Sequence, residues 1–268
     1  MLRLIACLIL VACLAQPAGA ESDRRPVDRF TLAEAADFSK QIERELAQRG
    51  AYVALVFRSG RPRADLPDGI RYTHGAFWVY GPIETVDGET VYGYAVYNLY
   101  HDEEDTGRSR LVQDWPLDFT RGDAVGQAGV IVPTPQMQVR VLDVIASDTY
   151  DALHQPAYSL LSNPTDLRFQ NCTEFLLDVV ASAAWLRTDR MQIKVNLAAY
   201  FSPTELRIGW WQRLTARWFD RRIRFDDHEG PVHIATFTSI ADFMEAFSLA
   251  DEIFEVEARF PGDEPPSP

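Results

Sequence analysis

Three apolar segments with the character of β-strands lie in the first half of the chain and constrain its fold most. Residues 52–57 form a continuous apolar run, which is typical of a buried strand. Residues 72–80 and 91–100 follow, and Asp87-Gly88 between them is a signal for a β-hairpin. We therefore expect these segments to pair in an antiparallel sheet.

Helices are predicted on both sides of this group of strands. Thr31-Leu32-Ala33-Glu34 has the pattern of a capping box, and the helix that it starts is expected to end at Gly50. Thr134-Pro135 predicts the start of a second helix, which extends to about Ala146. A third, amphipathic helix is predicted from Cys172 to about Leu186.

The rest of the chain completes an α+β pattern. The two polar stretches 101–124 and 148–170 are predicted to be loops. The other expected elements are a strand at 130–132, a helix from Pro203 to about Phe219, two strands around a turn at Glu229-Gly230, a helix from Ser239 to Phe247 and a last strand. We expect one α+β domain over residues 21–260, with helices beside a largely antiparallel sheet and a disordered tail at 261–268.

The first twenty residues have the pattern of a secretory signal peptide. Arg3 precedes an apolar run that ends near Ala15, which is shorter than the roughly 20 residues of a transmembrane helix. Ala18-Gly19-Ala20 then supplies the small residues of a cleavage site. The pattern predicts a periplasmic or secreted protein without an integral membrane segment. In the alternative interpretation, Leu10-Val11-Ala12-Cys13 resembles a lipobox, and Cys13 carries a lipid anchor.

The charge of the chain disfavours one class of partner. With 39 acidic and 26 basic side chains, the formal net charge is −13, so we expect no nucleic-acid partner. The sequence shows neither a glycine-rich phosphate loop nor zinc-ligand spacing, and we expect no cofactor and no metal. The expected partner is a small-molecule, peptide or acyl substrate. The sequence leaves the oligomeric state open.

Cys172 is the strongest candidate for a chemical role. It is the one cysteine that remains if the first twenty residues are removed. Asn171 is a favoured N-cap and Glu174 follows three residues later, which places Cys172 in the first turn of its helix. A helix N-terminus favours the thiolate and offers N–H groups for an oxyanion hole. We interpret Cys172 as a nucleophile; a buried inert cysteine and an intermolecular disulfide are the alternatives.

A nucleophilic cysteine needs a base within hydrogen-bond reach. Among the five histidines, His74 is the candidate, because it enters a predicted strand beside Gly75, which allows a close approach. A two-residue turn at Asp87-Gly88 would place position 74 opposite His101, which could orient the imidazole. Asn98 is the other candidate, since its amide oxygen can accept from the imidazole N–H without adding charge.

The order of these residues resembles that of known hydrolases. A histidine on a strand, a polar residue on a second strand and Asn-Cys-x-x-Phe at the start of a helix resemble the circularly permuted papain-like hydrolases. These include permuted NlpC-type peptidases and lecithin retinol acyltransferase-like enzymes. A closer resemblance, over about residues 30–260, is to the uncharacterised Gram-negative family called domain of unknown function 2145. It is carried by Gly60-Arg61-Pro62-Arg63, Tyr72-Thr73-His74, Asn98-Leu99-Tyr100, Asn163-Pro164 and Gln170-Asn171-Cys172.

The papain-like resemblance implies both a fold and an activity. It implies a permuted NlpC-type fold in which the helix that carries Cys172 packs against the antiparallel sheet. It also implies a catalytic set of Cys172, His74 and Asn98, and so favours Asn98 over His101. The expected function is an exported thiol hydrolase or acyltransferase that acts on an amide or (thio)ester bond in the cell envelope. The alternative is a non-catalytic binding or structural protein with the same fold.

Overall fold

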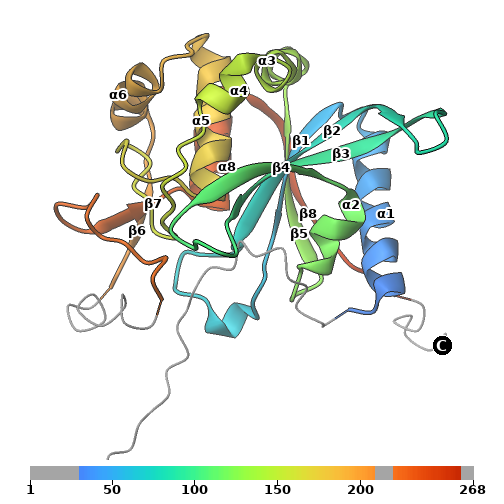
Figure 1. Cartoon of the computed structure of the whole chain (residues 1–268), viewed down its shortest axis with the longest axis horizontal. Coiled ribbons are helices and arrows are strands. Elements are labelled where there is room, and N and C mark those ends of the chain that lie inside the picture. The colour runs from blue at the N-terminus through green and yellow to red at the C-terminus, as the bar shows by residue number, and fades with distance from the viewer. Residues whose placement is uncertain (1–29, 209–219, 261–268) are drawn as a thin grey trace, which may run out of the picture.

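The centre of the molecule is a six-stranded antiparallel sheet with the strand order β4-β3-β2-β1-β5-β8 (Figure 1). The computed structural model describes residues 30–208 and 220–260, so the predicted signal peptide and tail lie outside it. The strands are β1 (Val53–Arg58), β2 (His74–Glu84), β3 (Thr90–His101), β4 (Ser109–Asp114), β5 (Gln127–Pro133) and β8 (Ala250–Glu257). The predicted α+β class and the large antiparallel sheet are confirmed.

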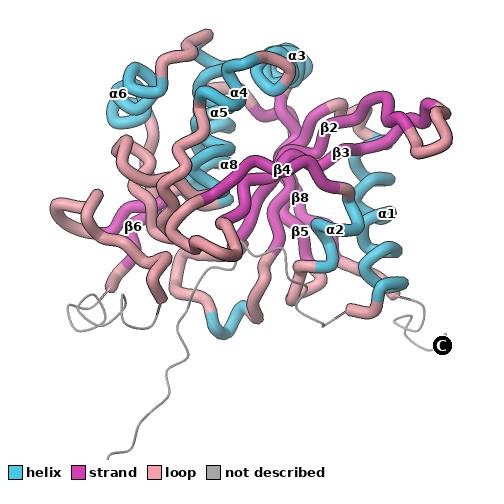
Figure 2. The backbone as a smooth tube through the Cα atoms, in the orientation of Figure 1, coloured by secondary structure: helices cyan, strands magenta, loops and turns pink. Residues whose placement is uncertain are grey.

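Helices cover both faces of the sheet (Figure 2). One face carries α1 (Leu32–Gln48) and α2 (Pro116–Arg121), whereas α3 (Pro135–Ile145), α5 (Cys172–Trp185) and α8 (Phe237–Ala246) pack on the other. The short helices α4 (Asp148–Ala152) and η1 (Arg63–Asp65), the helix α6 (Arg190–Tyr200) and the small sheet of β6 (Thr204–Leu206) and β7 (Val232–Ile234) complete the described elements.

The apolar run in β1 is buried because it faces a core on each side. Ala54 and Val56 belong to the core under α1, and Leu55 and Phe57 belong to the core under α5. Side chains of a strand alternate between the two faces of a sheet, so a strand that is covered on both faces shows a continuous apolar run. This explains why residues 52–57 show no polar alternation.

The hairpin of β2 and β3 turns at the predicted place but in a different register. Thr85 and Glu89 are hydrogen-bonded, which leaves residues 86–88 as the loop, and Gly88 has a φ of 78°. A three-residue loop with a left-handed glycine shifts the pairing by one residue from that of a two-residue turn. The ladder therefore pairs Phe77 with Tyr97, and its continuation places His74 opposite Tyr100 rather than His101.

Several predicted elements need correction. The predicted loops contain β4, α2 and α4, and α6 was not predicted at all. The predicted helix from Pro203 is wrong at its start, because Thr204–Leu206 pairs with Val232–Ile234 as a strand; residues 209–219 lie outside the described part. No strand precedes the turn at Glu229-Gly230 within residues 220–229. Two of these elements, β4 and β6, form by pairing with β3 and β7, which local sequence patterns do not record.

Candidate functional site

The candidate site lies where β2 and β3 separate. Their ladder ends at Phe77 and Tyr97, although β2 begins at His74 and β3 continues to His101. Beyond that point, β2 remains paired with β1, and β3 remains paired with β4. The separation leaves His74 on one strand and Asn98 on the other without a backbone ladder between them.

Asn98 bridges this separation to His74. The Nε2 atom of His74 lies 2.9 Å from Oδ1 of Asn98, and both residues are buried. An amide oxygen can only accept a hydrogen bond, so Nε2 carries the hydrogen and Nδ1 keeps the basic lone pair. His101, the alternative candidate, instead contacts Nη1 of Arg222 and the ring of Tyr158.

Aromatic rings enclose the imidazole. The ring of Tyr100 stacks on His74 with a centroid distance of 5.1 Å and an angle of 12°, and Phe119 of α2 lies at 5.6 Å. The Nδ1 atom of His74 is buried and has no hydrogen-bond partner. The enclosure therefore fixes the ring and leaves one nitrogen available for a proton.

Cys172 approaches the same part of β2 from the α5 face, the face to which Gly75 projects, whereas the His74 side chain projects to the α2 face. Its Sγ atom lies 4.0 Å from the carbonyl oxygen of Thr73, and the backbone of Gly75 also forms a hydrogen bond with the sulfur. The sulfur thus contacts the chain on either side of His74. A Cβ atom at Gly75 would lie 2.7–2.8 Å from Phe57 and Leu176, so a glycine is needed for α5 to pack this closely on β2.

The start of α5 follows the predicted cap. Oδ1 of Asn171 accepts hydrogen bonds from the backbone N–H of Glu174 and the hydroxyl of Thr173, each at 2.9 Å. Nδ2 of Asn171 donates to the carbonyl oxygen of Leu160 at 3.0 Å. The cap therefore fixes both the first turn of the helix and the segment that runs beside it, and it places Cys172 as the first residue of α5.

Burial favours the neutral form of both Cys172 and His74. Burial is the main reason why the pKa of Cys172 is raised, although backbone N–H groups and Arg58 act in the opposite direction. Burial and then Arg58 lower the pKa of His74 to about 3. The predicted depression of the thiol pKa by the helix N-terminus is therefore outweighed by desolvation. Cys172 is 3% exposed and His74 is not exposed at all.

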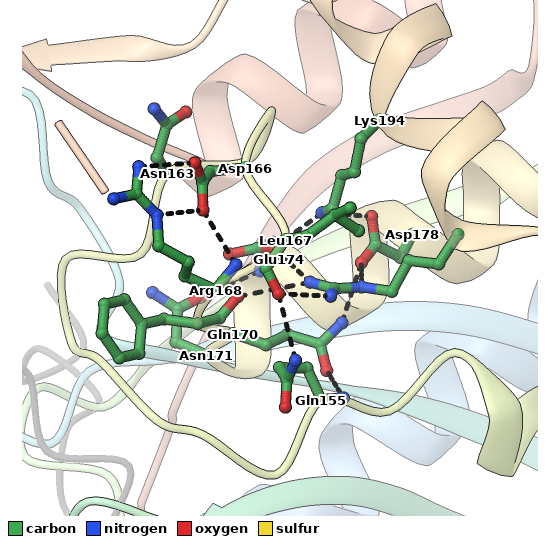
Figure 3. A network of polar contacts seen from close by, with 12 residues as sticks. Gln155, Asn163, Asp166, Leu167, Arg168, Gln170, Asn171, Glu174, Asp178 and Lys194 are labelled. Carbon is green, nitrogen blue, oxygen red and sulfur yellow. Dashed lines mark hydrogen bonds and ion pairs between the residues drawn. The ribbon is translucent and has the colours of Figure 1, made fainter. Parts of the chain in front are cut away.

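The side of α5 that faces α6 carries a buried charge network (Figure 3). Nζ of Lys194 lies 2.6 Å from carboxylate oxygens of both Glu174 and Asp178. Arg190 contacts the same two acids at 3.0 and 3.1 Å, and Gln170 donates to Asp178 at 2.8 Å. Buried charges of opposite sign in contact fix the relative position of two helices. The network therefore ties the helix that carries Cys172 to α6.

Sequence reasoning did not find Arg58, Tyr100 or this charge network. Glu174 and Asp178 are spaced by four residues on a helix that has no other charged residue, which was a usable signal for a buried partner of opposite charge. Among the described residues, no group of three or more His, Cys, Asp or Glu side chains could hold a metal ion. A polar cavity of about 450 Å³ lies elsewhere, lined by Glu104, Asp105, Thr106, Gly107, Arg221 and Arg224.

Comparison with protein families gives a match over most of the chain. A family model described as "Uncharacterized protein conserved in bacteria (DUF2145)" matches residues 45–244, which include Arg58, His74, Asn98 and Cys172. No curated protein and no solved structure matches the chain. Within the described residues, no helix is long and apolar enough to cross a membrane.

Proposed function

The chain belongs to DUF2145, a family of uncharacterised bacterial proteins, and from the site within the matched region we propose that it is a thiol hydrolase or acyltransferase. Cys172 is the nucleophile, His74 the base, and Asn98 the residue that orients the imidazole. The substrate is an amide or a (thio)ester. The order of the three residues along the chain and their elements supports a permuted papain-like fold of the NlpC type.

One observation carries the proposal. The His74 ring donates through Nε2 to Asn98, while its Nδ1 is buried without a partner beside the backbone that the Cys172 sulfur contacts. A basic nitrogen that is enclosed, oriented and unpaired costs free energy in a purely structural role. A free, oriented lone pair of this kind is what a general base needs, and the proposal requires it to come within hydrogen-bond reach of the Cys172 thiol during the reaction.

The proposed reaction gives each of these groups a step. Nδ1 of His74 takes the proton from the Cys172 thiol as the sulfur attacks the carbonyl carbon. The bond from that carbon to the leaving nitrogen, oxygen or sulfur breaks, and the leaving group takes the proton from the imidazolium. Water or an acceptor nucleophile then attacks the acyl-cysteine through the same base and regenerates the thiol. N–H groups at the start of α5 stabilise the negative oxygen of each tetrahedral intermediate.

The signal-peptide pattern of residues 1–20 supports export, so we place this reaction in the cell envelope. The burial of Cys172 and His74 favours a second candidate, a non-catalytic binding or structural protein that retains the fold. The two candidates differ in whether Cys172 becomes acylated.

Acylation by an activated ester separates the two candidates. Purified protein is mixed with p-nitrophenyl acetate, and intact mass and peptide mapping follow the acetyl group. We expect acetyl-Cys172 to form in the wild type and to be absent in Cys172→Ser. His74→Gln should slow its formation by about 10²- to 10⁴-fold, whereas His233→Gln, at a half-exposed histidine, should leave the rate unchanged. A Cys172 thiol that is acetylated only after denaturation would exclude the enzyme.

A non-reducing gel of the same samples tests the third interpretation, a structural disulfide. A Cys172-dependent covalent dimer in the native protein would contradict both the interpretation of Cys172 as a nucleophile and its interpretation as a buried, inert thiol. We expect a single monomeric band, because the sulfur lies inside the contact between α5 and β2.

A further inference from the structure

A buried arginine lies beside the proposed catalytic pair and takes no part in the reaction described above. Arg58 ends β1, is 2% exposed and is the direct cross-strand partner of His74. Cross-strand partners project on the same face of a sheet. Both side chains contact Phe119: the Cζ atom of Arg58 lies 5.4 Å from the ring centroid, and the ring of His74 lies at 5.6 Å.

The position of the guanidinium group depends on a glycine. Nη1 of Arg58 donates to the carbonyl oxygen of Gly122. A Cβ atom at Gly122 would lie 2.4 Å from Cζ and Nη2 of Arg58. Gly122 has a φ of −86°, which any residue can adopt, so the requirement for glycine comes from the space that the guanidinium occupies.

Asp123 provides an anion next to this position. Its carboxylate accepts hydrogen bonds from the backbone N–H groups of Ser59, Val125 and Gly126. Arg58 acts to lower the pKa of Asp123, although burial raises it overall. The backbone contacts hold this carboxylate in place, so the cation and its neighbouring anion are both fixed on the His74 side of the sheet.

We propose that Arg58 is a positioning residue whose fixed positive charge keeps the imidazole of His74 unprotonated, and so available as the base for Cys172. This inference rests on the proposed function. A guanidinium stays protonated at any working pH. A like charge within about 4–6 Å disfavours the protonated form of a histidine.

The electrostatic surroundings agree with this role. Arg58 is the largest contribution after burial to the lowered pKa of His74, and it also acts to lower the pKa of Cys172. His101 acts in the same direction on His74 but more weakly, whereas the hydrogen bond to Asn98 opposes both. The surrounding elements also carry the buried groups Asp114 at the end of β4, Tyr100 on β3 and Asp123 after α2, and α2 carries Asp118 and Arg121.

The same charge affects both halves of the reaction. It leaves the imidazole free to accept the thiol proton, and it makes the imidazolium a stronger acid once the proton has moved. The proton is then passed readily to the leaving group when the bond to the carbonyl carbon breaks. In the acylation step the proton moves from Cys172 to His74 and from His74 to the leaving group, and Arg58 itself neither gains nor loses it.

The test measures the ionisation of His74 directly. Histidine ring signals are followed by NMR against pH in the wild type, Arg58→Lys, Arg58→Met and Gly122→Ala, with Gly81→Ala as the control. Gly81 has open space where a Cβ atom would lie, so its substitution tests only the general effect of a Gly→Ala change. Folding of each variant is confirmed by circular dichroism and thermal unfolding.

We expect Arg58→Met and Gly122→Ala to raise the pKa of His74 by roughly one unit or more, because the cation is lost or displaced. Arg58→Lys should stay within a few tenths of a unit of the wild type, and Gly81→Ala should match it. If Arg58→Met does not fold, Gly122→Ala decides the result. An unchanged His74 pKa in the folded variants overturns the inference.

The pH dependence of Cys172 acetylation separates this inference from the proposed function. If both hold, the acidic limb of the rate profile moves to higher pH together with the NMR pKa. If acetylation is absent in the wild type, the proposed function fails, whatever the NMR titration shows. If acetylation occurs and the limb stays fixed in Arg58→Met and Gly122→Ala, the role of Arg58 fails while the function stands.

Discussion

The two sides of α5 carry buried polar groups that are stabilised in different ways. On the side that faces α6, Glu174 and Asp178 bind Lys194 and Arg190, so charge is balanced by charge. At the end that faces β2, the Cys172 sulfur contacts backbone groups on either side of His74, and the imidazole of His74 lies among aromatic rings. The first group is suited to holding helices together, and the second leaves a nitrogen and a sulfur without strong partners.

Burial favours the neutral form of one residue in each group, but the two residues affect the pH dependence of stability in opposite directions. Burial is the main reason why the pKa of Glu174 is raised to about 7 and that of His74 is lowered to about 3. An acid with a raised pKa binds its proton more tightly in the folded state, whereas a base with a lowered pKa binds it more weakly. The two regions can therefore be distinguished by mutation and by pH.

The largest expected effect is the loss of a cation from the charge network. Lys194→Met removes the ammonium that contacts both Glu174 and Asp178, and leaves Arg190 to balance two buried acids. Breaking a buried ion pair in this way costs about 3–5 kcal/mol. We expect a loss of this size in the free energy of unfolding, measured by urea denaturation at pH 7.

The chain offers a matched control for this change. Lys40 and Lys194 are its two lysines, and Lys40 forms an exposed pair with Glu43 at 2.8 Å on α1. Lys40→Met should change stability by about 0.5 kcal/mol or less. Equal losses in both variants would show that the network around Lys194 is not the stabilising feature inferred from the contacts.

The next effect is on the pH dependence of stability, where the two regions should differ in sign. His74 has a folded pKa of about 3 against an ordinary 6.5, so its contribution is complete above pH 6.5 and is lost as the pH falls toward 3. Glu174 has a folded pKa of about 7 against an ordinary 4.5, so its contribution is complete below pH 4.5 and is lost as the pH rises through 7.

Urea denaturation from pH 3.5 to 8 compares His74→Gln and Glu174→Gln with the wild type. One proton contributes a slope of at most about 1.4 kcal/mol per pH unit. His74→Gln should remove the slope that His74 contributes on the acidic side. His154, whose pKa is about 4, should keep contributing a slope of the same sign in the variant. Glu174→Gln should remove a slope of opposite sign between pH 4.5 and 7. Parallel curves for the wild type and either variant would contradict the assigned pKa direction.

Part of the site could be predicted from the sequence. Asn171 and Glu174 predicted the start of α5 because a helix cap depends on residues three apart, and the structure shows that cap. His74 and Asn98 were predicted as a pair, but only the family resemblance favoured Asn98 over His101. The turn arithmetic pointed to His101, because the loop at 86–88 has one residue more than assumed.

Arg58 and the charge network could not be found by local pattern. Arg58 becomes relevant only because β1 pairs with β2 in a register that places it opposite His74. Lys194 becomes relevant because α6, which was not predicted, packs against α5. Both depend on contacts between segments distant in sequence, where local propensity gives no information about the partner.

The smallest expected effect concerns Asn171, which belongs to neither side of α5 but fixes where the helix begins. Asn171→Ala removes the acceptor for Glu174 N–H and Thr173 Oγ1 and the donor to Leu160, so we expect a loss of about 1–2 kcal/mol in the free energy of unfolding. Asn171→Asp keeps the acceptor and should lose less. Asp189→Ala, at the exposed cap of α6, is the control and should cost about 0.5–1 kcal/mol. An Asn171→Ala loss no larger than that of Asp189→Ala would show that the side-chain contact with Leu160 contributes little, and that the position of Cys172 is set by the packing of α5 rather than by its cap.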